Sequence, residues 1–383
     1  MPLVALCFAF VASFTWRHAP LRGGWWKAAI AVGEYGHWFA GLPLGLAALA
    51  WQLLEGWTCA LTLGLCLAAV ASLLRPLVAA RRLARSLPAG LAAAFGPAAA
   101  VARGKPFSLR RLFWHPLPAP ADVRTETFAR SAGVELALDF YRANRRPEDG
   151  PAPCLVVVHG GGWDGGDRAQ LAAWNHRWAA RGYAVAAISY RLAPRFRWPA
   201  PREDVAAALA WLKAQAGRLG LDARRLVLVG RSAGGQIATA VGCGANDPAI
   251  VGIVSFYAPQ DMQFAWSVSR EDDALNSVNL MRQYLGGPPD TPERRALYDS
   301  ASAQLLAGPA SPPILLMHGR PDTLVWYRHS ERFGQRLRAV GAPHFHLELP
   351  WATHGFDFNL DGPGGQLADH AVEGFLRAVT RAG

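Results

Sequence analysis

Residues 225–234 (RLVLVGRSAG) decide the fold, because the sequence changes character sharply within this stretch. Residues 225–229 are a short apolar run typical of a strand, and a helix-compatible stretch follows from Gly235 to Gly242. Between them, Ser232 stands in the pattern GxSxG, whose glycines permit a strained turn and the close approach of neighbouring segments. The pattern alone is a weak signal in a chain with 39 glycines. With its neighbours it predicts a strand, a sharp turn that holds the Ser232 hydroxyl clear of a sheet, and a helix.

A second glycine-rich turn, residues 159–163 (HGGGW), follows the apolar run Cys154 to Val158, which is typical of a buried parallel strand. Three successive residues without side chains let bare backbone approach a ligand. We expect the N–H groups of Gly161 and Gly162, together with that of Ala233, to form an oxyanion hole for the tetrahedral intermediate of acyl transfer. A flexible glycine loop is the alternative interpretation.

An acid and a base follow two further predicted strands. Asp322 lies in the loop after the apolar run Pro313 to Met317, and His354 lies in the loop after the alternating run His344 to Leu349. At the top of the sheet, His354 is expected to take the proton of Ser232 and later protonate the leaving group, while Asp322 fixes its tautomer. The order Ser, Asp, His is that of the α/β-hydrolase fold. The predicted fold class is therefore α/β, with a mostly parallel sheet and helices on both faces.

Other residues are weaker candidates for the same chemistry. His318 closes a strand and is the nearest rival to His354 as the base. Asp204 and Glu203 begin a helix, where acids favour the helix dipole, and are second choices for the acid. His159 is expected to shape the glycine turn. The predicted catalytic residues are therefore Ser232, Asp322 and His354.

The motifs quoted above are similar to those of the hormone-sensitive-lipase-type esterases of the α/β-hydrolase superfamily, including the feruloyl-esterase-like branch. The resemblance covers about residues 121–382 and includes YRLAP at 190–194 and WPAPRED at 198–204. It implies a carboxylic ester hydrolase that uses this triad and needs no cofactor. Two departures concern substrate preference: Arg231 precedes the serine where many relatives carry an acid, and Arg195 stands where a Glu often follows YRLAP.

The composition argues against other classes of protein. The five cysteines are scattered, without the spacing of a disulfide framework or a zinc site, so we expect no metal. The net charge of +11 would suggest a nucleic-acid partner. However, residues 1–119 hold 11 basic and 2 acidic residues, which leaves 28 basic and 26 acidic residues for the rest. The hydrolase part is nearly neutral, and no nucleic-acid partner is predicted.

The basic N-terminal part is also the most apolar. Met1 to Thr15, Gly36 to Leu54 and Trp57 to Leu74 are candidate membrane spans, and the last two approach the roughly 20 residues that cross a bilayer. Arginines and lysine lie between the first two spans and after the third, whereas the turn at Glu55 is not basic. The positive-inside rule therefore predicts a multi-pass protein, with two or three spans in residues 1–80 and the catalytic domain in the cytoplasm. A helical hairpin packed on a soluble enzyme is the alternative.

The remainder divides into a predicted linker at 81–119, rich in Ala, Gly and Pro, and a catalytic domain at 120–383. The domain is expected to open with an antiparallel hairpin. An irregular insertion at about 259–310 is expected to cover the active site as a cap. Several apolar residues are candidates to bind an apolar acyl or aryl group: Phe264, Trp266, Leu280, Met281 and Tyr284 of this insertion, together with Trp163. Packing within the cap is the alternative for the residues of the insertion, and packing of the glycine turn is the alternative for Trp163.

These features together predict a membrane-attached serine carboxylic ester hydrolase that acts through an acyl-enzyme on apolar or lipid-like esters. The expected partners are a small-molecule or lipid ester and the membrane, and the oligomeric state is left open. An amidase or peptidase with the same triad is one alternative, because acyl-enzyme chemistry does not distinguish an ester from an amide. A non-catalytic receptor or scaffold on the same fold is the other, although such a protein would be expected to lose a triad member.

Overall fold

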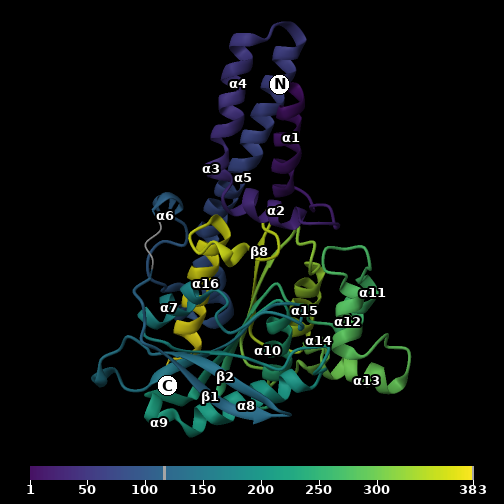
Figure 1. The fold of residues 1–383 in the computed structure, drawn as a ribbon. Helices are drawn as coiled ribbons and strands as arrows, with labels where there is room; N and C mark the ends of the chain where they lie inside the picture. Colours follow the sequence, from purple (N-terminus) through teal and green to yellow (C-terminus); the bar gives the residue numbers. More distant parts are fainter. Residues whose placement is uncertain (115–117, 382–383) are drawn as a thin grey trace.

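A computed structural model describes residues 1–114 and 118–381, and a single eight-stranded sheet organises most of them (Figure 1). The strand order is β1-β2-β4-β3-β5-β6-β7-β8. Strands β1 and β2 form an antiparallel hairpin, β2 pairs antiparallel with β4, and the pairs from β4 through β8 are parallel. The strands are β1 (Val123–Ser131), β2 (Val134–Tyr141), β3 (Ala152–Val158), β4 (Ala184–Ile188), β5 (Leu221–Arg231), β6 (Ile250–Phe256), β7 (Ile314–Gly319) and β8 (His344–Leu349).

The apolar runs of the sequence become the central strands, and their register brings the functional loops to one edge. All seven residues of β3 are buried, as expected for a strand covered on both faces. Val158 at the end of β3 pairs with Gly230, and Arg231 at the end of β5 pairs with Phe256. The loops after these strands therefore emerge side by side at the carboxyl edge of the sheet.

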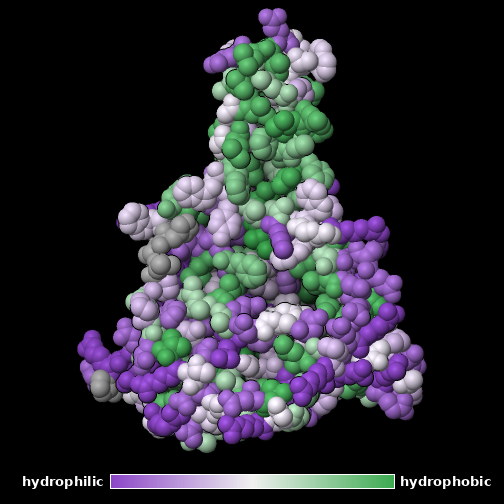
Figure 2. Space-filling view, in the orientation of Figure 1, coloured by the Kyte–Doolittle hydropathy of each residue, from purple (hydrophilic) through white to green (hydrophobic). Residues whose placement is uncertain are grey.

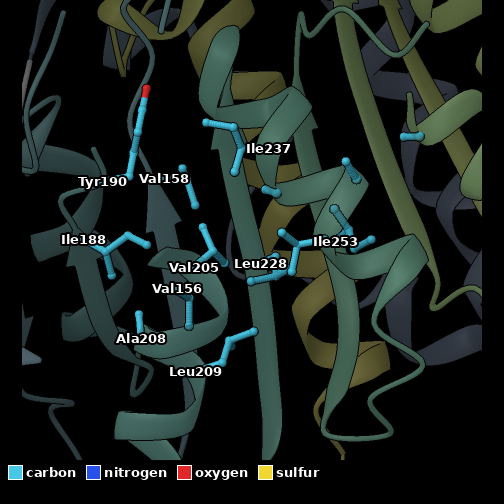
Figure 3. Close-up of a cluster of buried hydrophobic side chains, with 14 of the residues drawn as sticks. Val156, Val158, Ile188, Tyr190, Val205, Ala208, Leu209, Leu228, Ile237 and Ile253 are labelled. Atoms are coloured by element: carbon cyan, nitrogen blue, oxygen red, sulfur yellow. The ribbon is translucent and has the colours of Figure 1, made fainter. Parts of the chain in front are cut away.

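Helices cover both faces of the sheet, so the predicted α/β architecture is confirmed. On one face, strand residues such as Val156 and Leu228 lie beside Val205 and Leu209 of α8 (Figure 3). Alternate strand residues turn to the other face and pack on α7, α16 and the lower part of α5. The helices of the first face are α8 (Ala200–Ala214), α10 (Ala233–Gly244) and α15 (Arg328–Ala339), and those of the second include α7 (Ala172–Ala180) and α16 (Pro363–Val379).

The segment between β6 and β7, which was expected to form a cap, contains four helices. It starts with α11 (Met262–Val268) and α12 (Ser277–Leu285) and continues with α13 (Pro292–Ser300) and α14 (Ala303–Leu306). Asp261 caps α11 by accepting a hydrogen bond from the backbone N–H of Phe264, and Thr291 caps α13 in the same way from Arg294. Shorter elements complete the domain: α9 (Ala216–Leu219) and the 3₁₀ turns Pro147–Asp149 and Phe356–Phe358.

The N-terminal helices form a bundle that projects from the body of the protein (Figure 1). Its helices are α1 (Pro2–Ala12), α3 (Gly36–Phe39), α4 (Gly41–Leu53) and the first part of α5 (Gly56–Phe95), while α2 (Trp25–Glu34) lies across its foot. The 3₁₀ turn Ser13–Thr15 extends α1, and a break at Ala40 separates α3 from α4. Hydrophobic residues dominate the face of the bundle that Figure 2 shows. One helix of the described chain, Gly56–Phe95, is long and apolar enough to cross a membrane.

The structure differs from the linker that was expected at 81–119. The first residues of this segment continue α5 as far as Phe95, and the whole helix runs through Pro76 and Pro88. Leu87 and Leu91 are buried in the core that α5 shares with α16 and the sheet. Tertiary packing therefore stabilises a helix that the two prolines alone would disfavour. Beyond α5, the 3₁₀ turn Pro97–Ala100 and α6 (Leu109–Phe113) follow, and the linker residues 115–117 lie outside the described residues.

Candidate active site

Ser232 lies at the sharp turn between β5 and α10 that its sequence pattern predicts. Its backbone has φ 52° and ψ −121°, a combination that a residue with a side chain rarely adopts, and its N–H donates to the Phe256 carbonyl at 2.9 Å. Gly234 makes the turn possible, because a Cβ there would lie 2.2 Å from the His159 carbonyl oxygen. The strained turn presents the serine at the carboxyl edge of the sheet.

Asp322 and His354 meet at the same edge, although 32 residues separate them in the chain. His354 Nδ1 and Asp322 Oδ2 are 2.8 Å apart. Asp322 is fully buried, and its other oxygen accepts hydrogen bonds from the backbone N–H groups of Leu324 and Val325 at 2.8 and 3.0 Å. Burial by itself would raise the pKa of Asp322, but the charges and hydrogen bonds of His354 and His318 outweigh it and hold the pKa below its usual range. A carboxylate that stays ionised is suited to orient His354 and to stabilise its protonated form.

The rival base, His318, contacts the same carboxylate oxygen of Asp322 as His354 does. Its Nδ1 is 2.7 Å from Ser330 Oγ, and its Nε2 is 3.2 Å from Asp322 and 3.0 Å from the Val325 carbonyl. Both ring nitrogens therefore have partners within a fully buried site. His354, in contrast, lines the same cavity as Ser232. The geometry favours His354 as the base and gives His318 the role of a second support for Asp322.

The glycine turn after β3 borders the same cavity and keeps a conformation that favours glycine. The N–H of Gly160 donates to Gln170 Oε1 at 2.8 Å, which leaves Gly161 and Gly162 as the candidate donors of the turn. Gly161 has φ 130°, and a Cβ on it would lie 2.2 Å from the Gly165 carbonyl oxygen. Ala233 is the first residue of α10, where backbone N–H groups have no partner within the helix. All three predicted oxyanion donors border the cavity that holds Ser232.

The cavity has a volume of about 870 Å³, which is within the range of small-molecule sites. Of the predicted pocket residues, Trp163, Leu280 and Met281 line it. Trp163 is held there by a hydrogen bond to Gln236 Oε1 at 2.9 Å, and Tyr284 stacks on its ring without lining the cavity. Phe264 and Trp266 are not among its lining residues, so the structure does not bring them to the site. Phe264 lies against His329 of α15, with ring centroids 4.8 Å apart, and Trp266 contacts Tyr298 of α13, with ring centroids 6.4 Å apart. The alternative of packing within the insertion therefore fits Trp266, whereas Phe264 packs on a helix outside it.

The weaker acid candidates are occupied elsewhere. Asp204 accepts from the backbone N–H of Arg191 at 2.7 Å and from its Nε at 2.8 Å, and Glu203 pairs with the same guanidinium. His159 is buried, with Nδ1 2.8 Å from the Gly160 carbonyl and its ring stacked on Tyr190. These contacts shape the loops around the site. They also engage the side chains of the weaker candidates away from Ser232.

Sequence reasoning missed a buried ion pair. It joins the turn that carries Ser232 to the loop after β8 that carries His354, which is called the histidine loop below. Arg231 Nε donates to Asp357 Oδ2 at 2.5 Å, and the Tyr257 hydroxyl donates to Asp357 Oδ1 at 2.5 Å. Arg231 also lies over the ring of Phe256, 4.8 Å from its centroid. Arg231 immediately precedes Ser232, and Asp357 is three residues after His354. The sequence offered two signals for this pair, the unusual Arg231 and the acid of the HGFD segment. However, 126 residues separate them, so no local pattern indicates that they meet.

Comparisons with known proteins place this geometry in a family. The BD-FAE family model matches residues 138–337, which is 200 of the 383 residues. The chain is 35% identical to the esterase LipC of Mycobacterium tuberculosis over 262 residues, which cover 64% of this chain and 62% of LipC. It thus spans less than two thirds of LipC. It is 30% identical to the esterase LipQ of the same organism over 340 residues, which cover 79% of this chain and 76% of LipQ.

A solved structure agrees with these relatives. The esterase LipW from Mycobacterium marinum is 26% identical, with a TM-score of 0.56 over 80% of this chain and 89% of LipW. The predicted resemblance to α/β-hydrolase esterases is therefore confirmed for the hydrolase part. The chain belongs to the BD-FAE family, and its hydrolase part has the α/β-hydrolase fold of the esterases to which it is similar.

Proposed function

We propose that this protein is a membrane-attached serine hydrolase that cleaves apolar or lipid-like carboxylic esters through an acyl-enzyme. One observation carries the chemistry. His354, which is hydrogen-bonded to the buried Asp322, borders the cavity into which the strained turn presents Ser232. A nucleophile, a base and a group that orients the base are the three parts that acyl transfer by serine requires.

In the proposed mechanism, His354 accepts the hydroxyl proton as Ser232 attacks the ester carbonyl carbon. The negative charge that develops on the carbonyl oxygen is stabilised by the N–H groups of Gly161, Gly162 and Ala233. Protonated His354 then donates its proton to the departing alkoxide, and an alcohol leaves. In the second half, His354 deprotonates a water molecule, which attacks the acyl group and releases a carboxylic acid from Ser232.

The membrane part of the proposal rests on the surface of the bundle. Only 22% of the most apolar stretch of α5 is buried, whereas the core helix of a soluble protein would be mostly buried. Trp51 and Trp57, on either side of the turn between α4 and α5, are 74% and 73% exposed. Between residues 36 and 74 the only residue among Asp, Glu, Lys and Arg is Glu55. Such a surface is costly in water and suited to lipid.

The length and charge of the bundle fit a bilayer. Residues 56–74 of α5 extend about 28 Å, close to the thickness of about 30 Å of a hydrocarbon core. Basic residues follow at the foot of the bundle, from Arg75 onward, and the tip carries Glu55. The positive-inside rule then favours two or three membrane crossings with the hydrolase in the cytoplasm.

Turnover of p-nitrophenyl esters by the detergent-extracted full chain tests the chemistry. Ser232→Ala is expected to abolish hydrolysis and to keep the thermal unfolding profile, because the hydroxyl is lost and the fold is not. Activity in Ser232→Ala comparable to the parent would contradict the proposed nucleophile.

Alkaline extraction of membranes tests the attachment. The full-length protein is expected to remain with the lipid and to float with vesicles. Recovery of a soluble monomer without detergent would contradict membrane attachment and leave the ester chemistry standing.

A further inference from the structure

The N-terminal region contributes directly to the wall of the active-site cavity. Leu21, in the loop between α1 and α2, and Trp26, in the first turn of α2, line the cavity together with Ser232 and His354. They stand among apolar residues that come from the cap, from the loop after β7 and from the histidine loop. The apolar lining includes Leu21, Trp26, Leu280, Met281, Val325 and Phe358.

Helix α2 is fixed to the histidine loop by buried contacts, so the position of Leu21 and Trp26 is set by the fold. Glu34, at the end of α2, is buried and accepts hydrogen bonds from the backbone N–H of Gly364 at 2.8 Å and from Trp351 Nε1 at 3.3 Å. A Cβ on Gly364 would lie 2.7 Å from Glu34 Oε1, so the first turn of α16, which follows the loop with His354, and the end of α2 fit closely. The foot of the bundle is therefore part of the hydrolase, and not a tether beside it.

The loop before α2 also reaches the cap. Arg22 Nη2 donates to Asp272 Oδ2 at 2.7 Å, and Asp272 also pairs with Arg270 of the cap. Arg22 is largely exposed, so this contact is weak and can open. The loop between α1 and α2 and the cap together form the rim of the cavity on the side of the bundle.

We propose that the cavity takes a long-chain acyl ester directly from the bilayer, and that its acyl chain passes between the α1–α2 loop and the cap, along Leu21 and Trp26. This inference rests on the proposed function and names the route and the selecting residues. The apolar surface of the bundle places the rim at the membrane interface, where an ester group resides while its chains stay in the hydrocarbon. Removal of the Trp26 indole removes apolar wall from the chain's path but leaves Ser232, Asp322 and His354 in place.

The first test is a chain-length profile with p-nitrophenyl esters. For Trp26→Ala we expect kcat/KM for the palmitate ester to fall by about tenfold or more, in line with the discrimination that lost apolar contacts produce. The acetate ester should lose less, because its chain does not reach the rim, so the ratio of kcat/KM for palmitate to kcat/KM for acetate should fall. Leu21→Ser should act in the same direction. Trp51→Ala is the matched control, since Trp51 lies on α4 outside the cavity lining, and its profile should remain that of the parent.

The second test asks where the substrate comes from. The protein is reconstituted into vesicles that contain dioleoylglycerol, or into vesicles that lack it and are mixed with dioleoylglycerol vesicles. Entry from the bilayer predicts rapid hydrolysis only when enzyme and lipid share a membrane. Equal rates in both arrangements would overturn the route.

An unchanged chain-length profile in Trp26→Ala, or an equal loss for all chain lengths, would overturn the role of the rim. Failure of the proposed activity is distinguishable, because the parent protein would then hydrolyse neither the acetate nor the palmitate ester. That result would overturn the inference together with the activity on which it rests.

Discussion

The buried pair of Arg231 and Asp357 gives a prediction that can be worked through quantitatively. The side chains are 2% and 0% exposed, so neither charge has water to compensate for the loss of its partner. Asp357 uses one oxygen for Arg231 and the other for Tyr257. Asn has a single carbonyl oxygen, so Asp357→Asn leaves one of these donors facing an amide NH₂. Breaking a buried pair from one side costs about 3–5 kcal/mol.

The same change is expected to lower turnover. Tyr257 lies against His354, with ring centroids 4.3 Å apart, and Arg231 immediately precedes Ser232. The contacts of Asp357 with Arg231 and Tyr257 are called the clamp here. Its loss allows the nucleophile and the base to shift, and a misplacement of about 1 Å can cost about 100-fold in rate. We therefore expect kcat to fall by up to about 100-fold, with a smaller change in KM.

Denaturant unfolding of the detergent-extracted protein and esterase kinetics measure the two effects. Asp122→Asn is the control, because the Asp122–Arg124 pair is exposed and should contribute nothing measurable. The double variant Arg231→Met, Asp357→Leu should be more stable than Asp357→Asn, since it leaves no unpaired buried charge. If Asp357→Asn unfolds with the same midpoint as Asp122→Asn and keeps full turnover, the clamp has no role.

Three further predictions concern the site and its supports. Gly161→Ala should reduce kcat by about 100- to 1000-fold, as loss of an oxyanion donor does, because the new methyl group would meet the Gly165 carbonyl and displace the turn; ester kinetics measure it. Asp322→Asn should reduce kcat by about 10,000-fold without unfolding the protein, since an amide does not hold His354 in the tautomer that accepts the serine proton; a circular dichroism spectrum like the parent's would accompany the kinetic loss. Burial raises the pKa of Glu34 from 4.5 to about 8, so the folded state binds this proton more tightly than the unfolded state. The stability that this proton contributes is present below about pH 4.5 and is lost as the pH rises through about 8. Between pH 5 and pH 9 the melting temperature of the parent should therefore fall more than that of Glu34→Gln, and parallel curves would refute the assignment.

Much of the sheet and the site follows from local sequence patterns. The apolar runs predict the strands closely; the run His344 to Leu349 matches β8 at both ends. Glycine turns, a serine between glycines, and an acid and a base after successive strands predict which side chains share one edge. Such features are predictable because the alternation of a strand, the presence of glycine and the order of residues along the chain can all be read directly from the sequence.

The remaining features depend on contacts between distant parts of the chain. Pro76 and Pro88 argue for an interrupted helix, yet packing against α16 keeps α5 continuous. Phe264 was a candidate pocket residue because it is aromatic and lies in the insertion, but the path of the chain turns it toward His329. The approach of α2 to the catalytic domain depends on Glu34 fitting against Gly364 at the start of α16, 330 residues later in the chain. No pattern within a short window of sequence encodes these pairings.

The most direct test of the central claim is mass spectrometry of the protein after reaction with a fluorophosphonate probe, with Ser232→Ala treated in parallel. The probe requires a serine that its own base has activated. The account predicts a single modified peptide in the parent, with the adduct on Ser232, and no adduct in the variant. A folded parent protein that is not labelled, or an adduct on another serine that persists in Ser232→Ala, would contradict the proposed site.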